Sequence, residues 1–188
     1  MKIVLASQSP RRKELLGRLV PAFSIQPADI DETPKPNEDP LAYVQRMAVE
    51  KAEAVQKESE ETLVIASDTT VVLGNEILGK PEDDDEAKRM LRKFSGTTHD
   101  VYTAVVITDG TQKECILSHA SVTFYELTDE EIERYLATGD HRDKAGAYGI
   151  QSYAGAFVES ISGDYYSIVG FPIGAVNQAL KKWPDLLS

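Results

Sequence analysis

Three basic residues stand at the start of an expected helix, where the helix itself already presents positive charge. Residues 2–6 (KIVLA) form a short apolar run that is typical of a buried strand. Ser9 and Pro10 then have the residue types of an N-cap and a first helical position. The basic run 11–13 (RRK) falls in the first turn, where the helix dipole favours acidic side chains. The run indicates either an anion-binding site or long basic side chains that extend into solvent.

A carboxylate follows another strongly apolar stretch. Residues 62–67 (TLVIAS) predict a buried strand, and Asp68 comes directly after it. In open α/β sheets, ligands bind just beyond the carboxyl ends of such strands. A carboxylate at this place can hold a metal ion or take a proton from water. The alternative is an ordinary turn residue at a strand end, and the residue type alone leaves both possibilities open.

A third stretch, residues 143–156 (DKAGAYGIQSYAGA), is rich in glycine. Its three glycines remove side-chain bulk and allow a ligand to approach the backbone closely. The amide of Gln151 could form paired hydrogen bonds with the edge of a nucleobase. A flexible bend without a ligand is the alternative.

One phosphate-binding pattern is excluded. Residues 74–80 (GNEILGK) fit the first seven positions of a P-loop, but Pro81 offers neither the hydroxyl that holds magnesium nor the backbone N–H that contacts phosphate. The apolar pair 77–78 also predicts a strand inside what would be a bare loop. Lys80 remains a candidate for a separate contact with phosphate, as a point charge.

The composition is that of a soluble globular protein with one domain. Of 188 residues, 41% are hydrophobic and 27% are charged, and the formal net charge is −11. Such a charge argues against binding to the backbone of DNA or RNA. No apolar run approaches the roughly 18 residues of a membrane span, and the N-terminus lacks a signal peptide's apolar region. We expect a cytoplasmic protein without a membrane partner.

The remaining reactive side chains carry no recognisable site. Cys115 is the single cysteine, so it forms no intramolecular disulfide, and its apolar surroundings predict a buried thiol. His99, His119 and His141 lack metal-ligand spacing, and we expect them on the surface or in strands. The acidic run 82–86 (EDDDE) predicts a solvated helix start.

The predicted elements describe an α/β domain with a mixed central sheet. Helices are expected from residue 10, over 41–57, 83–94 and 128–139, and from 172 to about 183. Strands are expected over 2–6, 62–67, 70–74, 98–109 and 113–125, with a further hairpin over 154–169 that turns at 162–164. The dipeptide at 109–110 (DG) predicts a hairpin turn. Residues 128–131 predict a capping box, and the proline-rich stretch 29–40 predicts a loop.

Several of these motifs together resemble those of Maf-like nucleotide pyrophosphatases. The motifs are LASQSPRRKELL, VEKA, IASDT, LGKP, SG at 95–96, DKAGAYGIQ and GDYYSIVGFP, in the order seen in that family. The resemblance covers residues 2 to about 180 and is strongest to the pyrimidine type. It implies a single domain over residues 1–188 with a long mixed sheet, flanking helices and two lobes around a cleft, similar to inosine-triphosphate pyrophosphatases.

The resemblance also implies an activity, the hydrolysis of dTTP and UTP to a monophosphate plus pyrophosphate. Modified pyrimidine nucleotides are further candidate substrates. Family members usually use Mg²⁺ or Mn²⁺ and are commonly homodimers, so the resemblance implies both for this chain. A second hypothesis is a nucleotide-binding regulator of septum formation without significant turnover.

Site residues follow from the resemblance motif by motif. Asp68 matches the proton acceptor that activates water and a metal ligand, and Glu32 matches an acidic position near the metal. Arg12, Lys51 and Lys80 match positions that contact phosphate, and we expect them outside the core. The remaining substrate-binding positions are Ser7, Ser9, Arg11, Thr69 and Gln151, of which the last three are tied to base choice.

Overall fold

The computed structural model describes residues 1–57 and 61–184, and these divide into two compact units. Of these described residues, the first unit holds 1–57, 61–68, 103–118 and 170–184, and the second unit holds 69–102 and 119–169. Three strands, β3 (Thr62–Leu73), β5 (Thr98–Thr108) and β6 (Lys113–Phe124), contribute residues to both units.

Within the described residues, seven strands form one mixed sheet in the order β2-β1-β3-β5-β6-β7, with β4 paired to β3. The other strands are β1 (Lys2–Leu5), β2 (Ser24–Ile25), β4 (Glu76–Leu78) and β7 (Val158–Gly163). Strand β1 is parallel to β2 and β3, whereas β4 is antiparallel to β3, and β7 is antiparallel to β6. The prediction of an α/β fold with a mixed sheet and flanking helices is confirmed.

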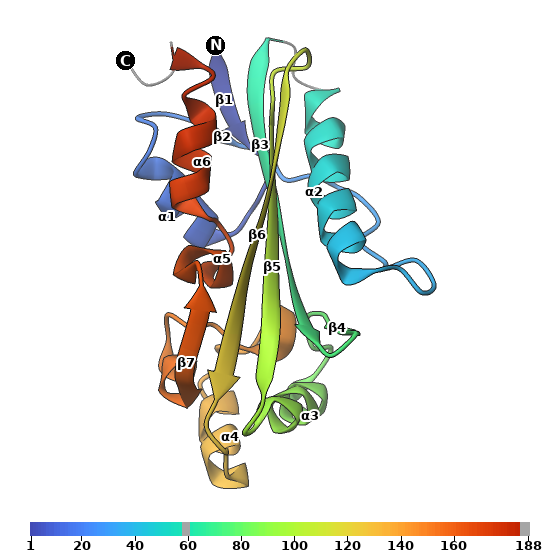
Figure 1. Cartoon of the computed structure of the whole chain (residues 1–188), viewed down its shortest axis with the longest axis vertical. Coiled ribbons are helices and arrows are strands. Elements are labelled where there is room, and N and C mark those ends of the chain that lie inside the picture. Colours follow the sequence, from blue (N-terminus) through green and yellow to red (C-terminus); the bar gives the residue numbers. More distant parts are fainter. Residues whose placement is uncertain (58–60, 185–188) are drawn as a thin grey trace. The chain divides into compact units, whose positions relative to one another are not determined.

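Helices cover the strands of the first unit on both sides. Helix α2 (Pro40–Gln56) lies on one side, and α1 (Pro10–Gly17) and α6 (Ile173–Leu180) lie on the other (Figure 1). Every residue in the 103–108 half of β5 is therefore buried. Ser9 caps α1 as predicted, and its side chain accepts a hydrogen bond from the backbone of Arg12.

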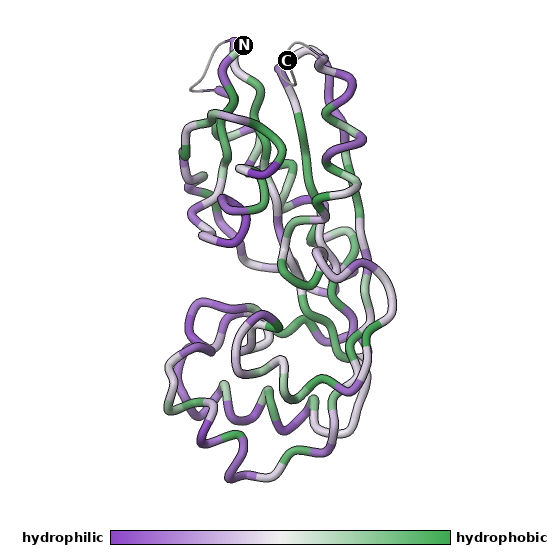
Figure 2. The backbone as a smooth tube through the Cα atoms, turned by 90° about the vertical axis from the view of Figure 1, so that its left-hand side faces the viewer, coloured by the Kyte–Doolittle hydropathy of each residue, from purple (hydrophilic) through white to green (hydrophobic). Residues whose placement is uncertain are grey.

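The second unit holds helices α3 (Asp84–Phe94), α4 (Asp129–Leu136) and α5 (Tyr165–Val169) and two short 3₁₀ segments. Helix α3 packs against α4 and begins with the predicted acidic turn, and Thr128 and Glu131 form the predicted capping box of α4. In the 98–102 half of β5, buried residues alternate with more exposed ones, as in a strand that is covered on one face. In Figure 2, hydrophobic and hydrophilic residues alternate along the helical turns, as expected for helices with one buried face.

Three element predictions are wrong: a break within one strand, a second hairpin, and the end of the last helix. Residues 62–67 and 70–74 are one strand, β3, because Ser67 and Asp68 continue the ladder and are buried in it. Residues 154–169 are not a hairpin, because a 3₁₀ segment (Tyr153–Phe157) precedes β7 and α5 follows it. The side chain and carbonyl of Asp164 accept backbone N–H groups at 166 and 167, and so start a helix where a second strand was expected. The last helix ends at Leu180 rather than near 183.

Burial corrects three further expectations. Cys115 is exposed, because residues 113–119 of β6 alternate between exposed and half-buried positions. His141 is buried in a turn rather than lying on the surface or in a strand, and its ring Nε2 donates to Oδ1 of Asp84 at 2.7 Å. Lys51 is also buried, although it was expected outside the core. Within residues 1–57 and 61–184, no helix has the length and apolar character needed to cross a bilayer.

Candidate active site

Arg12 is turned inward from the first turn of α1. Its guanidinium donates to the carbonyl of Gly170 at 2.9 Å, to the carbonyl of Ser67 at 2.8 Å, and to the hydroxyl of Ser7 at 3.3 Å. The carbonyl of Gly170 also accepts a hydrogen bond from the Ser67 hydroxyl at 3.1 Å. Arg12 therefore ties the start of α1 to β3 and to the segment that leads into α6, and does not extend into solvent.

The Ser7 hydroxyl has a second role beside Arg12. It accepts a hydrogen bond from the backbone N–H of Ser9 at 3.2 Å, so that Ser7 fixes the turn between β1 and α1. Arg11 is half-buried, whereas Lys13 is exposed. Of the three cations in the first turn, only Lys13 extends into solvent, as the alternative to an anion-binding site predicted.

A buried ammonium joins two carboxylates in the same unit. Lys51 on α2 contacts Oδ1 of Asp68 at 2.8 Å and Oε1 of Glu32 at 3.2 Å. The side chains of Lys51 and Asp68 are each 10% exposed, whereas that of Glu32 is 49% exposed. A buried charge needs such partners because desolvation is costly. We call Arg12, Glu32, Lys51 and Asp68 the charged cluster; it contains four of the five predicted catalytic residues.

Charge and burial shift two pKa values around this cluster. Burial lowers the pKa of Arg12 below its usual value; Asp68 opposes this shift, Arg11 adds to it, and Glu32 opposes it. Burial raises the pKa of Tyr43 to about 12, and the nearby carboxylates of Asp68 and Glu32 add to the rise. The Tyr43 hydroxyl therefore stays protonated at neutral pH and can act as a hydrogen-bond donor.

The other predicted site residues belong to the second unit. Thr69 follows Asp68 directly in β3, Lys80 is exposed between β4 and α3, and Gln151 is exposed in a turn. The backbone N–H of Gly146 donates to the carbonyl of Gly79 at 3.0 Å, so the glycine-rich segment lies beside the residue that precedes Lys80. The convergence of Thr69, Lys80 and Gln151 on the charged cluster stays a prediction.

The glycine at 146 allows this arrangement. Its φ is +70°, and a Cβ there would lie 3.0 Å from the side chain of Val71 on β3. A residue with a side chain would be strained by its backbone and would press against Val71. The structure therefore places the segments that carry Thr69, Lys80 and Gln151 side by side within the second unit.

The residues of the charged cluster fit a hard divalent cation. The carboxylates of Asp68 and Glu32 have the oxygen ligands that such an ion takes, and both approach the same nitrogen of Lys51, so that one ion could reach both. Among the described residues, no group of three or more His, Cys, Asp or Glu side chains gathers as a metal site. Mg²⁺ commonly binds through one or two carboxylates and completes its shell with water and phosphate oxygens.

Two contributors were missed from the sequence. Tyr43 donates a hydrogen bond to the carbonyl of Glu32 at 2.7 Å, and Arg46 donates to the carbonyl of Thr33 at 3.2 Å. Tyr43 and Arg46 are three residues apart on one helix, so a shared helix face was the signal available in the sequence.

These features define a class of protein, an α/β protein with cations and carboxylates gathered at a helix start and on one strand of a mixed sheet. The family model for Maf-like proteins matches residues 2–183, and the chain belongs to the Maf family. It is similar to a protein named dTTP/UTP pyrophosphatase from Pseudoalteromonas atlantica, with 49% identity over 184 residues, which is 96% of each chain. Proteins with the same name from Hahella chejuensis and Bacillus cereus are 47% and 44% identical, over 97% of this chain and 92% and 95% of theirs.

Proposed function

We propose that this protein hydrolyses nucleoside triphosphates, with dTTP and UTP as substrates, to a nucleoside monophosphate and pyrophosphate. The names of the relatives that match nearly the whole chain support the substrate class. The observation that carries the proposal is the charged cluster, in which a buried carboxylate and two cations lie together in the first unit. A nucleoside triphosphate brings about four negative charges, which the cations at the start of α1 and on α2 can balance.

The proposed reaction breaks the bond between the α-phosphorus and the oxygen that bridges to the β-phosphorus. Water attacks the α-phosphorus, one proton of that water passes to Asp68, and pyrophosphate leaves with the bridging oxygen and its electron pair. The ion pair with Lys51 fixes the direction of the Asp68 carboxylate. Phosphoryl transfer depends mainly on positioning and charge neutralisation, which Arg12, Lys51 and Lys80 supply in this proposal.

Mg²⁺ or Mn²⁺ is the proposed cofactor, held by Asp68 and Glu32. When bound, a divalent ion of this kind neutralises phosphate charge. The carboxylate of Glu32 is half-exposed, so in this proposal it can turn from Lys51 toward a bound ion. The hydrogen bond from Tyr43 to the carbonyl of Glu32 keeps the backbone in place meanwhile. We further propose a cytoplasmic homodimer, on the resemblance alone.

Base choice is assigned to Arg11, Thr69 and Gln151. A uracil or thymine edge offers two carbonyl acceptors beside one N–H donor, and a glutamine amide can pair with both kinds of group. A 5-methyl or other substituent need not disturb that edge, so modified pyrimidine nucleotides are included in the proposal.

The test is incubation of the protein with normal and modified triphosphates plus Mg²⁺, with separation of all phosphate products. Monophosphate and pyrophosphate are expected, with dTTP and UTP consumed well ahead of ATP and GTP. Release of single phosphate and a diphosphate would contradict the proposed bond cleavage. Nucleotide binding without turnover would favour the alternative, a regulator of septum formation, which the relatives' names do not favour.

A further inference from the structure

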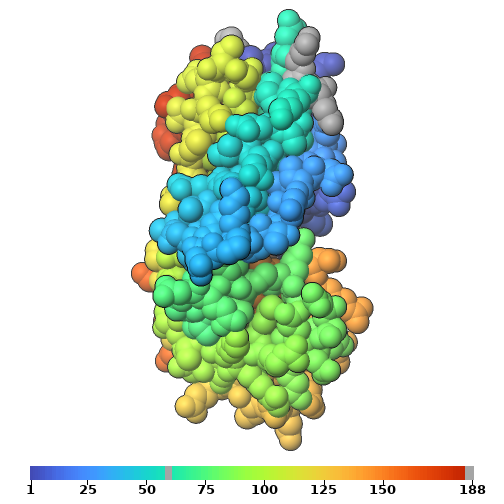
Figure 3. Space-filling model, turned by 90° about the vertical axis from the view of Figure 1, so that its right-hand side faces the viewer, coloured from blue at the N-terminus to red at the C-terminus, as the bar shows by residue number. Residues whose placement is uncertain are grey.

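The loop that carries Glu32 is held by polar contacts rather than by burial. Residues 29–37 lie outside helices and strands apart from a turn at 36–37, and all except half-buried Ile30 are exposed. Little apolar surface is therefore removed from water to keep this loop in place. Figure 3 shows the loop and α2, coloured from mid-blue to cyan, side by side on one face of the molecule.

Helix α2 holds the backbone of the loop at two successive carbonyls. The Tyr43 hydroxyl donates to the carbonyl of Glu32 at 2.7 Å, and Nη2 of Arg46 donates to the carbonyl of Thr33 at 3.2 Å. The same guanidinium forms a bidentate pair with Glu38, at 2.6 Å from Nε and 2.7 Å from Nη2. Bidentate pairs of this kind fix geometry as well as adding stability.

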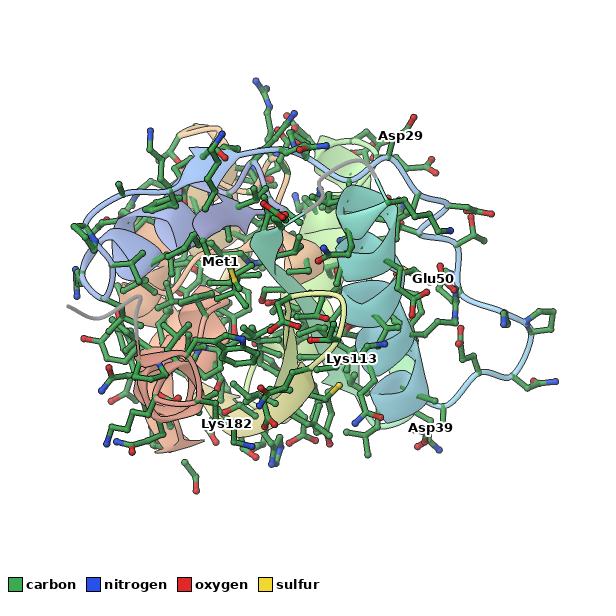
Figure 4. The ribbon with its side chains drawn as sticks, turned by 90° about the horizontal axis from the view of Figure 1, so that it is seen from above. Met1, Asp29, Asp39, Glu50, Lys113 and Lys182 are labelled. Carbon is green, nitrogen blue, oxygen red and sulfur yellow. The ribbon has the colours of Figure 1, made fainter. Side chains whose placement is uncertain are left out.

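Glu38 in turn closes the loop on itself. Its Oε2 accepts a hydrogen bond from the backbone N–H of Lys35 at 2.8 Å, and the Arg46 pair lowers the pKa of Glu38 to about 2. Glu50, one helical turn after Arg46, contacts Nη1 of the guanidinium at 3.2 Å. In Figure 4, the loop between Asp29 and Asp39 runs along one flank of α2, and Glu50 lies on that flank.

The helix that holds the loop backbone also supplies the cation that meets the Glu32 side chain. Tyr43, Arg46 and Glu50 are separated by three and four residues and share one face of α2. Lys51, about two turns after Tyr43, contacts Glu32 at 3.2 Å. We propose that Tyr43 and Arg46 are positioning residues that hold the loop so that the Glu32 carboxylate faces Lys51 and the metal site. This inference rests on the proposed function, in which Glu32 is a metal ligand.

The test uses the full-length protein and four variants: Tyr43→Phe, Arg46→Lys, Glu32→Gln and the double variant Tyr43→Phe/Glu32→Gln. Tyr43→Phe removes one hydroxyl, and Arg46→Lys keeps the charge but cannot reach Thr33 and Glu38 together. Tyr125→Phe, at an exposed tyrosine of the second unit, is the matched control. Two readouts are measured, Mn²⁺ affinity by electron paramagnetic resonance and amide hydrogen exchange in residues 29–38.

We expect Tyr43→Phe and Arg46→Lys to weaken Mn²⁺ binding about 3- to 10-fold and to speed exchange in the loop, as loss of one or two hydrogen bonds predicts. In the Glu32→Gln background, Tyr43→Phe should have no further effect on Mn²⁺ affinity, because it acts through Glu32. A purely structural role would instead give additive effects, and that result overturns the proposal.

Unchanged Mn²⁺ affinity in both single variants, or absence of Mn²⁺ binding by the unmodified protein, would also overturn it. Neither readout requires turnover. If the unmodified protein binds Mn²⁺ but hydrolyses no nucleotide, the proposed function fails while the positioning role is still decided by the variants.

Discussion

The two units bury different kinds of side chain. The first unit buries the charges of Lys51 and Asp68 as an ion pair, with Arg12 and Glu32 beside them. The second unit buries an aromatic cluster, which we define as Phe94, His99, Phe124 and Tyr148. In that cluster the ring centroids of Phe94 and His99 are 4.2 Å apart, and His99 Nε2 lies 2.6 Å from the Tyr148 hydroxyl.

The two units differ in how helices cover their strands, and this difference accompanies the difference in buried side chains. Helices on both sides bury every residue in the 103–108 half of β5, whereas the 98–102 half alternates. Buried ion pairs contribute little net stability, because desolvation offsets their attraction. Aromatic pairs contribute about 0.5–1.5 kcal/mol each beyond their buried area. We infer that the charged cluster serves chemistry, and that the aromatic cluster serves the stability of the segment that carries Gln151.

The largest effect is expected from Asp68→Asn. The change keeps the shape of the side chain but removes the base and the charge, so turnover of dTTP should fall at least ~100-fold. Lys51 keeps Glu32 as a partner at 3.2 Å, so the free energy of unfolding should fall by only about 1 kcal/mol. Product formation and urea denaturation measure the two effects.

Asp129→Asn is the matched control for that change. Asp129 pairs with Arg92 at 2.7 Å on the surface of the second unit, and an exposed pair contributes little to stability. Its turnover should match that of the unmodified protein. Near-normal turnover in Asp68→Asn would remove Asp68 from the proposed role.

The next effect, on stability, is expected from Lys51→Met. This change leaves the buried carboxylate of Asp68 without its ammonium partner, and such a loss costs about 3 kcal/mol. The double variant Lys51→Met/Asp68→Asn removes both charges, so its stability should recover to within about 1 kcal/mol of the unmodified protein. Its activity should not recover. A double variant no more stable than Lys51→Met would mean that the buried charges are not coupled.

Local signals predicted much of the fold, because they depend on neighbouring residues. Ser9 at the N-cap of α1, the capping box at Thr128 and the hairpin turn at Gly110 all lie where the sequence placed them. The exposure of Cys115 and the burial of His141 could not be predicted in this way. Both depend on which face of an element another element covers, and that information is not local.

The same limit applies to the candidate site. Residue types and motifs indicated Arg12, Lys51 and Asp68, but not that Lys51 is buried between two carboxylates. The contacts of Arg12 with the carbonyls of Ser67 and Gly170 join segments that are distant in sequence. No periodicity reports such contacts, which only the folded chain brings together.

A pH-dependent effect is expected from the aromatic cluster. Burial lowers the pKa of His99 from 6.5 to about 4, while Asp100 partly opposes the shift. The unfolded chain therefore binds a proton that the folded chain does not between these pH values, so stability is full above pH 6.5 and falls as the pH drops. As the pH falls from 7 to 5, the titration of His99 should lower the free energy of unfolding by roughly 2 kcal/mol.

His99→Gln isolates that contribution, because all other titrating groups are shared with the unmodified protein. The amide can still form a hydrogen bond with the Tyr148 hydroxyl but does not titrate. The difference in unfolding free energy between the two proteins should therefore change by roughly 2 kcal/mol from pH 7 to pH 5. Parallel pH profiles would show that His99 is not kept neutral by burial. The turnover of His99→Gln at pH 7 should stay within a few-fold of that of the unmodified protein.

The smallest effect, on base choice, is expected from Gln151→Glu. A glutamate accepts but does not donate hydrogen bonds, so it loses one kind of pairing with a uracil or thymine edge. Gln151 is exposed in the described structure, so the loss in kcat/KM for dTTP should be about 1 kcal/mol, near the net value of one hydrogen bond. Gln178→Glu on α6 is the matched control, because its side chain can still accept from Lys181. Changes in the charged cluster should lower kcat/KM for every nucleotide, whereas Gln151→Glu should lower it for dTTP and UTP and spare GTP. An equal loss for all bases would assign Gln151 to phosphate binding or folding, and selectivity would then have to come from Arg11 and Thr69.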